Sequence, residues 1–191
     1  EVAEDNSYTC DNVNTHNCTD ISNAGQQKGL QEGSGTRSSL LWECCKTIEA
    51  KKPKYLLMEN VKALVSQKFL PFYKKWEQWL AEMGYDNHCK VMNAKDYGVP
   101  QNRERIFIVS ILGEQSFQFP NPIPLEKRLK DVLEENVDEK YYISDKMLEY
   151  FERVNSDTSH GHNFTPKDGE DLAFTLRTGG GSRVDENYIK D

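Results

Sequence analysis

Apolar residues recur at helical spacing in two segments of the first half of the chain. Over residues 38–50, apolar side chains at positions i, i+4 and i+7 predict a helix, which Pro53 ends. Over residues 70–83, bulky apolar and aromatic side chains predict a second helix, which Gly84 ends. Each predicted helix therefore has an apolar face that can pack against another element.

Two continuous apolar runs are short enough to be strands. Residues 55–58 predict a buried strand, with Glu59 and Asn60 placed where it ends. Residues 106–112 have the clearest strand pattern, and residues 88–92 predict a further extended piece. Strands and helices that alternate with short connections predict an α/β sheet.

The character of the sequence changes after Phe119. Three prolines within five residues indicate a linker, and two amphipathic stretches, residues 125–136 and 144–154, predict surface helices. Glycine-rich text near the C-terminus resembles the start of a β-rich unit. The predicted division is an irregular N-terminal segment over 1–17, an α/β domain over 18–119, a linker with helices over 120–154, and the start of a further region over 155–191.

Charge and cysteine content narrow the function classes. The net charge of −7 argues against a protein that coats nucleic acid nonspecifically, although a local basic face remains compatible with it. The five cysteines are irregularly spaced and form no Cys-x-x-Cys pair, so neither a disulfide framework nor a metal site is indicated. No apolar run approaches the roughly 20 residues that cross a bilayer, and no secretion signal is evident. We therefore expect a cytoplasmic protein.

Glu59 is the strongest single candidate for chemistry. It follows a buried apolar run, and ligands of open α/β sheets bind outside the carboxyl ends of the strands. Desolvation at such a position raises the pKa of a carboxyl group, which could then donate a proton or hydrogen bond near neutral pH. The alternative is that Glu59 caps a helix or pairs with a surface lysine.

Gln101, Arg103 and Arg105 alternate, so they are expected on one side of an extended segment. Two guanidinium groups and an amide could hold a phosphate, a carboxylate or a polarised carbonyl. Alternatively, one arginine pairs with Glu104 or Asp96 and the others are solvated.

Cys18 lies ahead of a glycine-rich loop and is a candidate nucleophile. A reactive thiolate needs a nearby cation or a helix N-terminus, and locally only His16 could serve. The alternative is an incidental cysteine in a polar loop.

Taken together, three stretches resemble the DNA (cytosine-5)-methyltransferases of bacteria and phages. They are "CTDISNAGQQKGLQEGSGTRSSLLWE", "KPKYLLMENVKAL" and "NAKDYGVPQNRERIFIVS". The resemblance covers about residues 15–112, and the order, spacing and flanking text of the motifs make it specific. It implies an enzyme that moves a methyl group from S-adenosylmethionine to carbon-5 of a cytosine swung out of double-stranded DNA.

The resemblance also implies a role for each candidate. A thiolate at Cys18 would add to carbon-6 of the ring, and Glu59 would hydrogen-bond the ring nitrogen N3 and the exocyclic amine. Arg105, and secondarily Arg103, would hold the carbonyl of the base and the active-site loop, which Gln101 supports.

Three further positions match binding residues of the family. Ser22 matches a position that reaches the DNA backbone, Asn60 one that braces Glu59, and Leu40 one that lines the cofactor pocket. The implied fold is α/β, part of a Rossmann-like S-adenosylmethionine-dependent methyltransferase sheet with a helical and β C-terminal extension. Residues 18–119 would then be a partial catalytic domain, and residues 155–191 the start of a target recognition region.

The sequence also departs from the family pattern. Asn17 precedes Cys18 where the family has proline, and Thr19 stands where it has glutamine. The glycine-rich strand and loop that bind S-adenosylmethionine have no counterpart here, so we expect a second chain or a longer parent to supply most of that site. The alternatives are a catalytically inactive remnant of the family that binds DNA or protein, and an unrelated cytosolic α/β binding domain.

Overall fold

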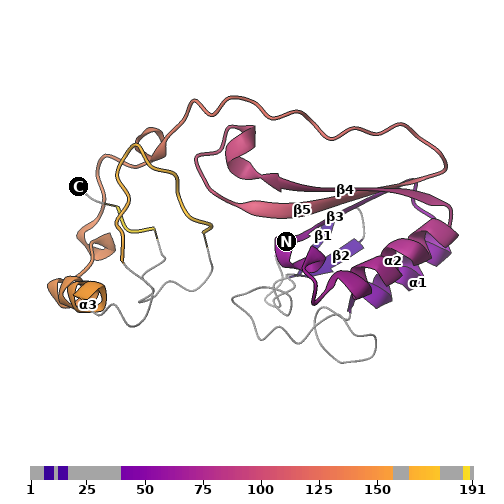
Figure 1. Cartoon of the computed structure of the whole chain (residues 1–191), viewed down its shortest axis with the longest axis horizontal. Coiled ribbons are helices and arrows are strands. Elements are labelled where there is room, and N and C mark those ends of the chain that lie inside the picture. The colour runs from indigo at the N-terminus through magenta and orange to yellow at the C-terminus, as the bar shows by residue number, and fades with distance from the viewer. Residues whose placement is uncertain (1–6, 11–12, 17–39, 157–163, 177–186, 190–191) are drawn as a thin grey trace. The chain divides into compact units, whose positions relative to one another are not determined.

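Figure 1 shows the computed structural model of the chain, which describes residues 7–10, 13–16, 40–156, 164–176 and 187–189. The chain divides into two compact units, each of which is described by itself. The first comprises Glu1–Met92 and Glu104–Pro120, and the second Asn93–Arg103 and Asn121–Asp191. The segment that carries Gln101 and Arg103 therefore belongs to the second unit, and Arg105 belongs to the first.

The first unit is built on a three-stranded sheet. Its order is β3 (Tyr55–Val61), β5 (Glu104–Leu112) and β4 (Tyr85–Asn93), and β3 runs antiparallel to β5 with Glu59 opposite Phe107. A mixed α/β unit is confirmed. The predicted end of the first strand at residue 58 was wrong, because backbone pairing with β5 continues to Val61. Glu59 thus lies within the strand and not beyond it.

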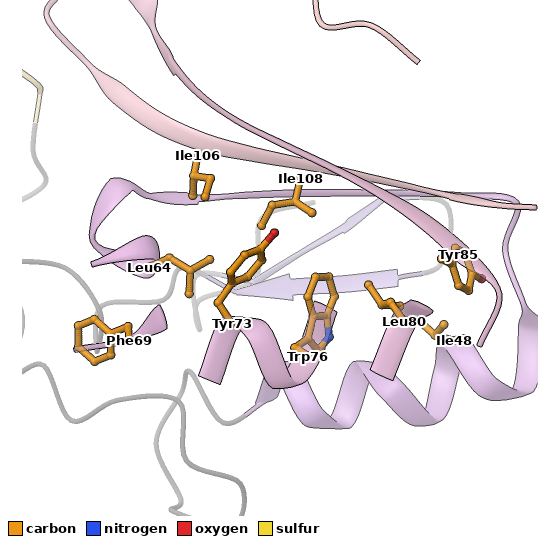
Figure 2. Close-up of a cluster of buried hydrophobic side chains, with 9 residues drawn as sticks. All are labelled: Ile48, Leu64, Phe69, Tyr73, Trp76, Leu80, Tyr85, Ile106 and Ile108. Atoms are coloured by element: carbon orange, nitrogen blue, oxygen red, sulfur yellow. The ribbon is translucent and has the colours of Figure 1, made fainter. Parts of the chain in front are cut away.

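Two helices cover one face of this sheet, α1 (Leu40–Lys51) and α2 (Leu70–Glu82) (Figure 1). Both confirm the predicted helices to within a few residues. Alternation along β5 points Ile106 and Ile108 toward the helices, where their exposed fractions are 0% and 1%. The core side chains shown in Figure 2 are Ile48, Leu64, Phe69, Tyr73, Trp76, Leu80, Tyr85, Ile106 and Ile108.

Local signals set the limits of α2. Pro71 occupies its first turn, where a missing backbone N–H costs nothing and a fixed φ favours the helix. At its other end Gly84 has a φ of +92°, a backbone conformation that side chains disfavour, and the chain turns there into β4. Within the described parts of the chain, no helix is both long and apolar enough to span a bilayer.

The N-terminal segment, predicted to be irregular, contains a short antiparallel pair of strands. These are β1 (Ser7–Cys10) and β2 (Val13–His16), with Ser7 opposite His16. Tyr, Val and Thr favour strands, a preference that the low apolar content of the segment concealed.

In the second unit, aromatic stacking holds the predicted second surface helix in place. This helix is α3 (Asp145–Ser156), and its Phe151 is 1% exposed. Phe151 stacks on Phe164 with ring centres 3.9 Å apart and meets Tyr188 edge-on at 4.9 Å.

The helix predicted over residues 125–136 was wrong, because only a short 3₁₀ turn, Leu129–Asp131, forms there. Backbone N–H groups that a helix would use internally are bonded elsewhere in the unit. Lys130 N donates to the carbonyl of Gly169 at 2.9 Å, and Leu129 N donates to that of Asp171 at 3.3 Å. Tertiary pairing therefore overrides the helical pattern. The predicted β-rich unit falls largely on residues 177–186, which lie outside the described residues, and stays a prediction.

Candidate active site

The structure brings together Glu59 and Arg105, two of the side chains that the sequence assigned to one site. Antiparallel register places Val61 opposite Arg105 and Phe107 opposite Glu59, so Glu59 and Arg105 are diagonal neighbours on one face of the sheet. Arg105 Nε lies 3.0 Å from Glu59 Oε1. Residues 46 positions apart in the chain, by subtraction of their numbers, therefore form a direct ion pair.

The Glu59–Arg105 pair lies on the face of the sheet opposite to the helices, because its residues alternate with the core residue Ile106. The Glu59 side chain is 47% exposed and that of Arg105 is 18% exposed. An ion pair this open to solvent contributes at most about 1 kcal/mol to stability. The need for a stable fold is therefore a weak explanation of a charged pair at this position.

The ion pairs around Glu59 and Arg105 bear on the alternatives that the sequence left open. The Glu104 carboxylate is held by Lys62, whose Nζ donates to both carboxylate oxygens at 3.0 Å. Glu59 in turn pairs with an arginine and not with a surface lysine. Arg105 Nη1 also donates to the backbone carbonyl of Glu104 at 2.8 Å, which further fixes the guanidinium.

Asn60, predicted to brace Glu59, makes a local hydrogen bond. Its side-chain Oδ1 accepts from the backbone N–H of Val61 at 2.8 Å. This bond occupies the last backbone donor of β3, two residues after Glu59. That Asn60 braces the Glu59 carboxylate stays a prediction.

Gln101 and Arg103 lie in the second unit, in a segment whose backbone is held by contacts with other residues of that unit. Arg103 N donates to Asn93 Oδ1 at 3.0 Å, and the Arg103 carbonyl accepts from Ala94 N at 3.0 Å. Gln101 forms an isolated bridge with Ala173. Asn93 is a positioning residue that the sequence reasoning missed; its signal is an asparagine at the end of a strand, where it caps the 3₁₀ turn Ala94–Tyr97.

Three predicted site residues cannot be placed beside the Glu59–Arg105 pair. Cys18 and Ser22 lie outside the described residues. Leu40 begins α1, and the structure describes its backbone alone. The nucleophile, the DNA-backbone contact and the cofactor contact therefore stay predictions.

One hollow among the described residues lacks the apolar lining that a cofactor pocket usually has. This shallow hollow of about 450 Å³ lies between α2 and β4, and charged and amide side chains such as Lys74, Glu77 and Asn87 line it, and neither residue of the Glu59–Arg105 pair does. Across the ranges that the structure describes, no three His, Cys, Asp or Glu side chains gather closely enough to hold a metal ion.

Comparison with known proteins decides the family. Residues 16–185 match the family described as C-5 cytosine-specific DNA methylase. The chain belongs to this family. The Glu59–Arg105 pair therefore lies in the matched region of a C-5 cytosine DNA methylase, a family that uses S-adenosylmethionine.

Several curated relatives are similar over part of their length. The type II methyltransferase M2.ScrFI of Lactococcus lactis subsp. cremoris is 52% identical over 132 residues, which cover 69% of this chain and 37% of the relative. The orphan methyltransferase M.SssI of Spiroplasma monobiae is 42% identical over 137 residues, covering 70% of this chain and 35% of the relative. The chain thus spans little more than a third of the length of these relatives.

Solved structures support the fold. The DNMT2 of Spodoptera frugiperda, solved as a mutant, aligns with a TM-score of 0.55 at 20% identity, covering 75% of this chain and 43% of that one. The Dnmt2 methyltransferase of S. pombe aligns with a TM-score of 0.53 at 18% identity, covering 71% and 43%. At these identities the likeness concerns the mixed α/β fold alone.

Proposed function

We propose that this chain is the catalytic portion of a DNA (cytosine-5)-methyltransferase that acts on a cytosine flipped out of double-stranded DNA. The observation that carries the proposal is the 3.0 Å contact between Glu59 and Arg105 on the face of the sheet opposite to α1 and α2. Membership of the C-5 cytosine DNA methylase family supports it. The finer fold proposed is part of a Rossmann-like methyltransferase sheet.

A carboxyl group is suited to activate a cytosine. Glu59 would hydrogen-bond ring nitrogen N3 and the exocyclic amine and so favour the ring protonated at N3, which draws electrons away from carbon-6. The Arg105 guanidinium holds the Glu59 carboxyl in one direction and presents a positive charge beside the base carbonyl. A base still stacked in the duplex could not reach these groups, so the target must be extruded.

The nucleophile in the proposal is Cys18. Its thiolate forms a bond to carbon-6, and the electrons of the carbon-5–carbon-6 double bond then make carbon-5 nucleophilic. S-adenosylmethionine, the cofactor of the family, supplies the methyl group when bound. Loss of the carbon-5 proton returns the electron pair to the ring, and the carbon–sulfur bond breaks to release Cys18.

Relatives about three times longer than the matched segment carry methyltransferase names, and this chain covers 37% of M2.ScrFI. We therefore propose that methyl transfer needs the remaining portion of such an enzyme together with this chain. In this proposal Ser22, Gln101 and Arg103 contact DNA or support the active-site loop, and Leu40 contacts the cofactor.

The test uses a single polypeptide in which residues 16–185 of this chain replace the matching segment of M2.ScrFI, called the joined enzyme below. Methyl transfer to unmethylated genomic DNA is measured as 5-methylcytosine by mass spectrometry. We expect activity in the joined enzyme and a loss of 100-fold or more in turnover for Glu59→Gln, with DNA affinity within about twofold. Glu104→Gln, which breaks the neighbouring Lys62 ion pair, is the matched control and should retain turnover. Equal losses of turnover in Glu59→Gln and Glu104→Gln would refute the proposed role of Glu59. Equal losses of turnover and DNA affinity in Glu59→Gln would refute it as well.

A further inference from the structure

The loop over residues 100–103, which carries two of the predicted site residues, is held by a distant backbone segment of the second unit. Ala173 N donates to the carbonyl of Pro100 at 2.9 Å, and Asn102 N donates to the carbonyl of Ala173 at 2.8 Å. These two bonds form a parallel bridge between Gln101 and Ala173. The backbone of the 100–103 loop is therefore fixed by a residue 72 positions after Gln101, by subtraction of the residue numbers.

The next residue, Phe174, is held by a single side chain. Phe174 N donates to Asn187 Oδ1 at 2.6 Å, and Asn187 Nδ2 donates to the carbonyl of Phe174 at 3.2 Å. A side-chain amide has both a donor and an acceptor, so it can take the place of a backbone partner on a neighbouring strand. In an extended segment, adjacent residues direct their backbone groups to opposite sides. This pair of bonds, the Asn187 clamp, therefore supports the segment from the side away from the 100–103 loop.

Asn187 is itself anchored through the residue that follows it. The ring of Tyr188 lies 4.9 Å from that of Phe151 and 5.2 Å from that of Phe164, and the carbonyl of Tyr188 accepts from Lys167 N at 2.7 Å. Phe151 belongs to α3 and is buried. The backbone at Asn187 is therefore held by the aromatic cluster of the second unit, so its side chain can act as a support.

A second asparagine makes the same pair of bonds elsewhere in this unit. Phe164 N donates to Asn155 Oδ1 at 2.6 Å, and Asn155 Nδ2 donates to the carbonyl of Phe164 at 3.0 Å. The two clamps share their chemistry but hold different segments. Phe164 stacks on Phe151 of α3, whereas Phe174 adjoins the bridge to the 100–103 loop. The second clamp therefore provides an internal comparison for the first.

We infer that Asn187 is a positioning residue for the proposed methyl transfer. It keeps Ala173 paired with the 100–103 loop, and the paired loop fixes the backbone of Gln101 and Arg103. The inference rests on the proposed function, in which these two residues contact DNA or support the active-site loop. A displacement of about 1 Å that begins far from the reacting atoms can cost roughly 100-fold in rate. The role of Asn187 is indirect, because its amide bonds the backbone next to Ala173.

The first measurement is amide hydrogen exchange by NMR in the full 191-residue chain. Asn187→Ala should raise the exchange rates of the Asn102 and Ala173 amides at least tenfold, because both amides donate in the bridge. The matched control, Asn155→Ala, removes an equivalent pair of bonds and should leave these two rates within about twofold. The amide of Leu112, bonded within the first unit, is the reference and should exchange equally in all three proteins.

The second measurement is turnover at saturating DNA, in a version of the joined enzyme that carries residues 16–191 of this chain. Asn187→Ala should lower turnover at least tenfold, because saturating DNA compensates for weaker binding but not for a displaced loop. Asn187→Asp keeps an acceptor for the N–H of Phe174 and should therefore lose less turnover. Asn155→Ala should remain within about twofold of the unsubstituted enzyme.

Three outcomes overturn the inference. The Asn102 and Ala173 amides exchange no faster in Asn187→Ala; the two alanine variants raise these rates, or lower turnover, equally; or turnover of Asn187→Ala stays within twofold despite faster exchange. The last outcome leaves the proposed function in place. An inactive unsubstituted enzyme instead removes the proposed methyl transfer, while the exchange rates still decide whether Asn187 fixes the 100–103 loop.

Discussion

The Glu59–Arg105 pair joins two side chains whose neighbours on β3 and β5 are mainly apolar. Arg105 approaches the carboxylate through Nε, and its Nη1 donates to the backbone of Glu104. A lysine has the same charge but a single nitrogen at the end of a flexible stem, so it cannot make both contacts in this fixed arrangement. The geometry of the guanidinium, and not its charge alone, is therefore proposed to matter.

Arg105→Lys in the joined enzyme tests this point. We expect turnover to fall at least tenfold while the free energy of unfolding changes by less than about 1 kcal/mol, because the ion pair is open to solvent. Single-turnover methyl transfer and urea unfolding measure the two quantities. Lys62→Ala, which removes a neighbouring exposed ion pair, should leave turnover within about twofold. Full turnover in Arg105→Lys would contradict the role.

At the residue scale, the sequence predicted that Glu59 and Arg105 act together but could not predict their contact. Alternation indicates which side of a strand a residue occupies, whereas the antiparallel register that makes them diagonal neighbours depends on the pairing of distant segments. For the same reason, the sequence could not predict that Asn93 and Ala94 hold the backbone of Arg103 in the second unit.

At the scale of elements, helix α2 presents a buried phenol to the sheet. Tyr73 is 2% exposed, and its hydroxyl donates to Glu77 Oε1 at 2.8 Å. Burial raises the pKa of Tyr73 above its usual value, and hydrogen bonds with Cys89 and Glu77 raise this pKa further. Burial also raises the pKa of Tyr85. Folding therefore favours the protonated phenols.

This predicts a loss of stability in alkali. An unfolded tyrosine loses its proton near pH 10, whereas folded Tyr73 keeps its proton, so the stability it contributes is fully present below about pH 10 and falls as the pH rises above that value. Above about pH 10, Tyr73→Phe should reduce the slope of the free energy of unfolding against pH by about 1.4 kcal/mol per pH unit. It should also cost about 1 kcal/mol at pH 8 through the lost hydrogen bond to Glu77. Urea unfolding between pH 8 and 11 measures both effects. Tyr141→Phe, at a ring that is 70% exposed, should keep the full slope, and an unchanged slope in Tyr73→Phe would refute the prediction.

A helix could be predicted from the sequence where residues within and next to it determine its structure. Helices α1 and α2 combine a sustained apolar face with Pro53 and Gly84 as end signals, and both were predicted to within a few residues. Residues 125–136 have a similar pattern, but their backbone bonds Gly169 and Asp171 instead. Such distant pairing leaves no local trace in the sequence.

At the scale of the whole molecule, the family assignment rests on residues 16–185, while the chain spans 37% of M2.ScrFI. The sequence resemblance predicted the family because its motifs combine in a fixed order. The family assignment does not test whether Cys18 lies close to the Glu59–Arg105 pair. Cys18 lies outside the described residues and belongs to the site only in the proposal. A test of that claim must connect the thiol chemically to the Glu59–Arg105 pair.

The most direct measurement is covalent trapping on DNA containing 5-fluorocytosine, whose fluorine cannot leave as a proton does, so the adduct on carbon-6 persists. The joined enzyme with S-adenosylmethionine should form a protein–DNA species stable in denaturing gels, with mass spectrometry locating the bond at Cys18. Cys18→Ser should abolish the species, and Glu59→Gln should slow its formation at least tenfold. An adduct that survives Cys18→Ser, or that forms at an undiminished rate in Glu59→Gln, would contradict the proposed active site.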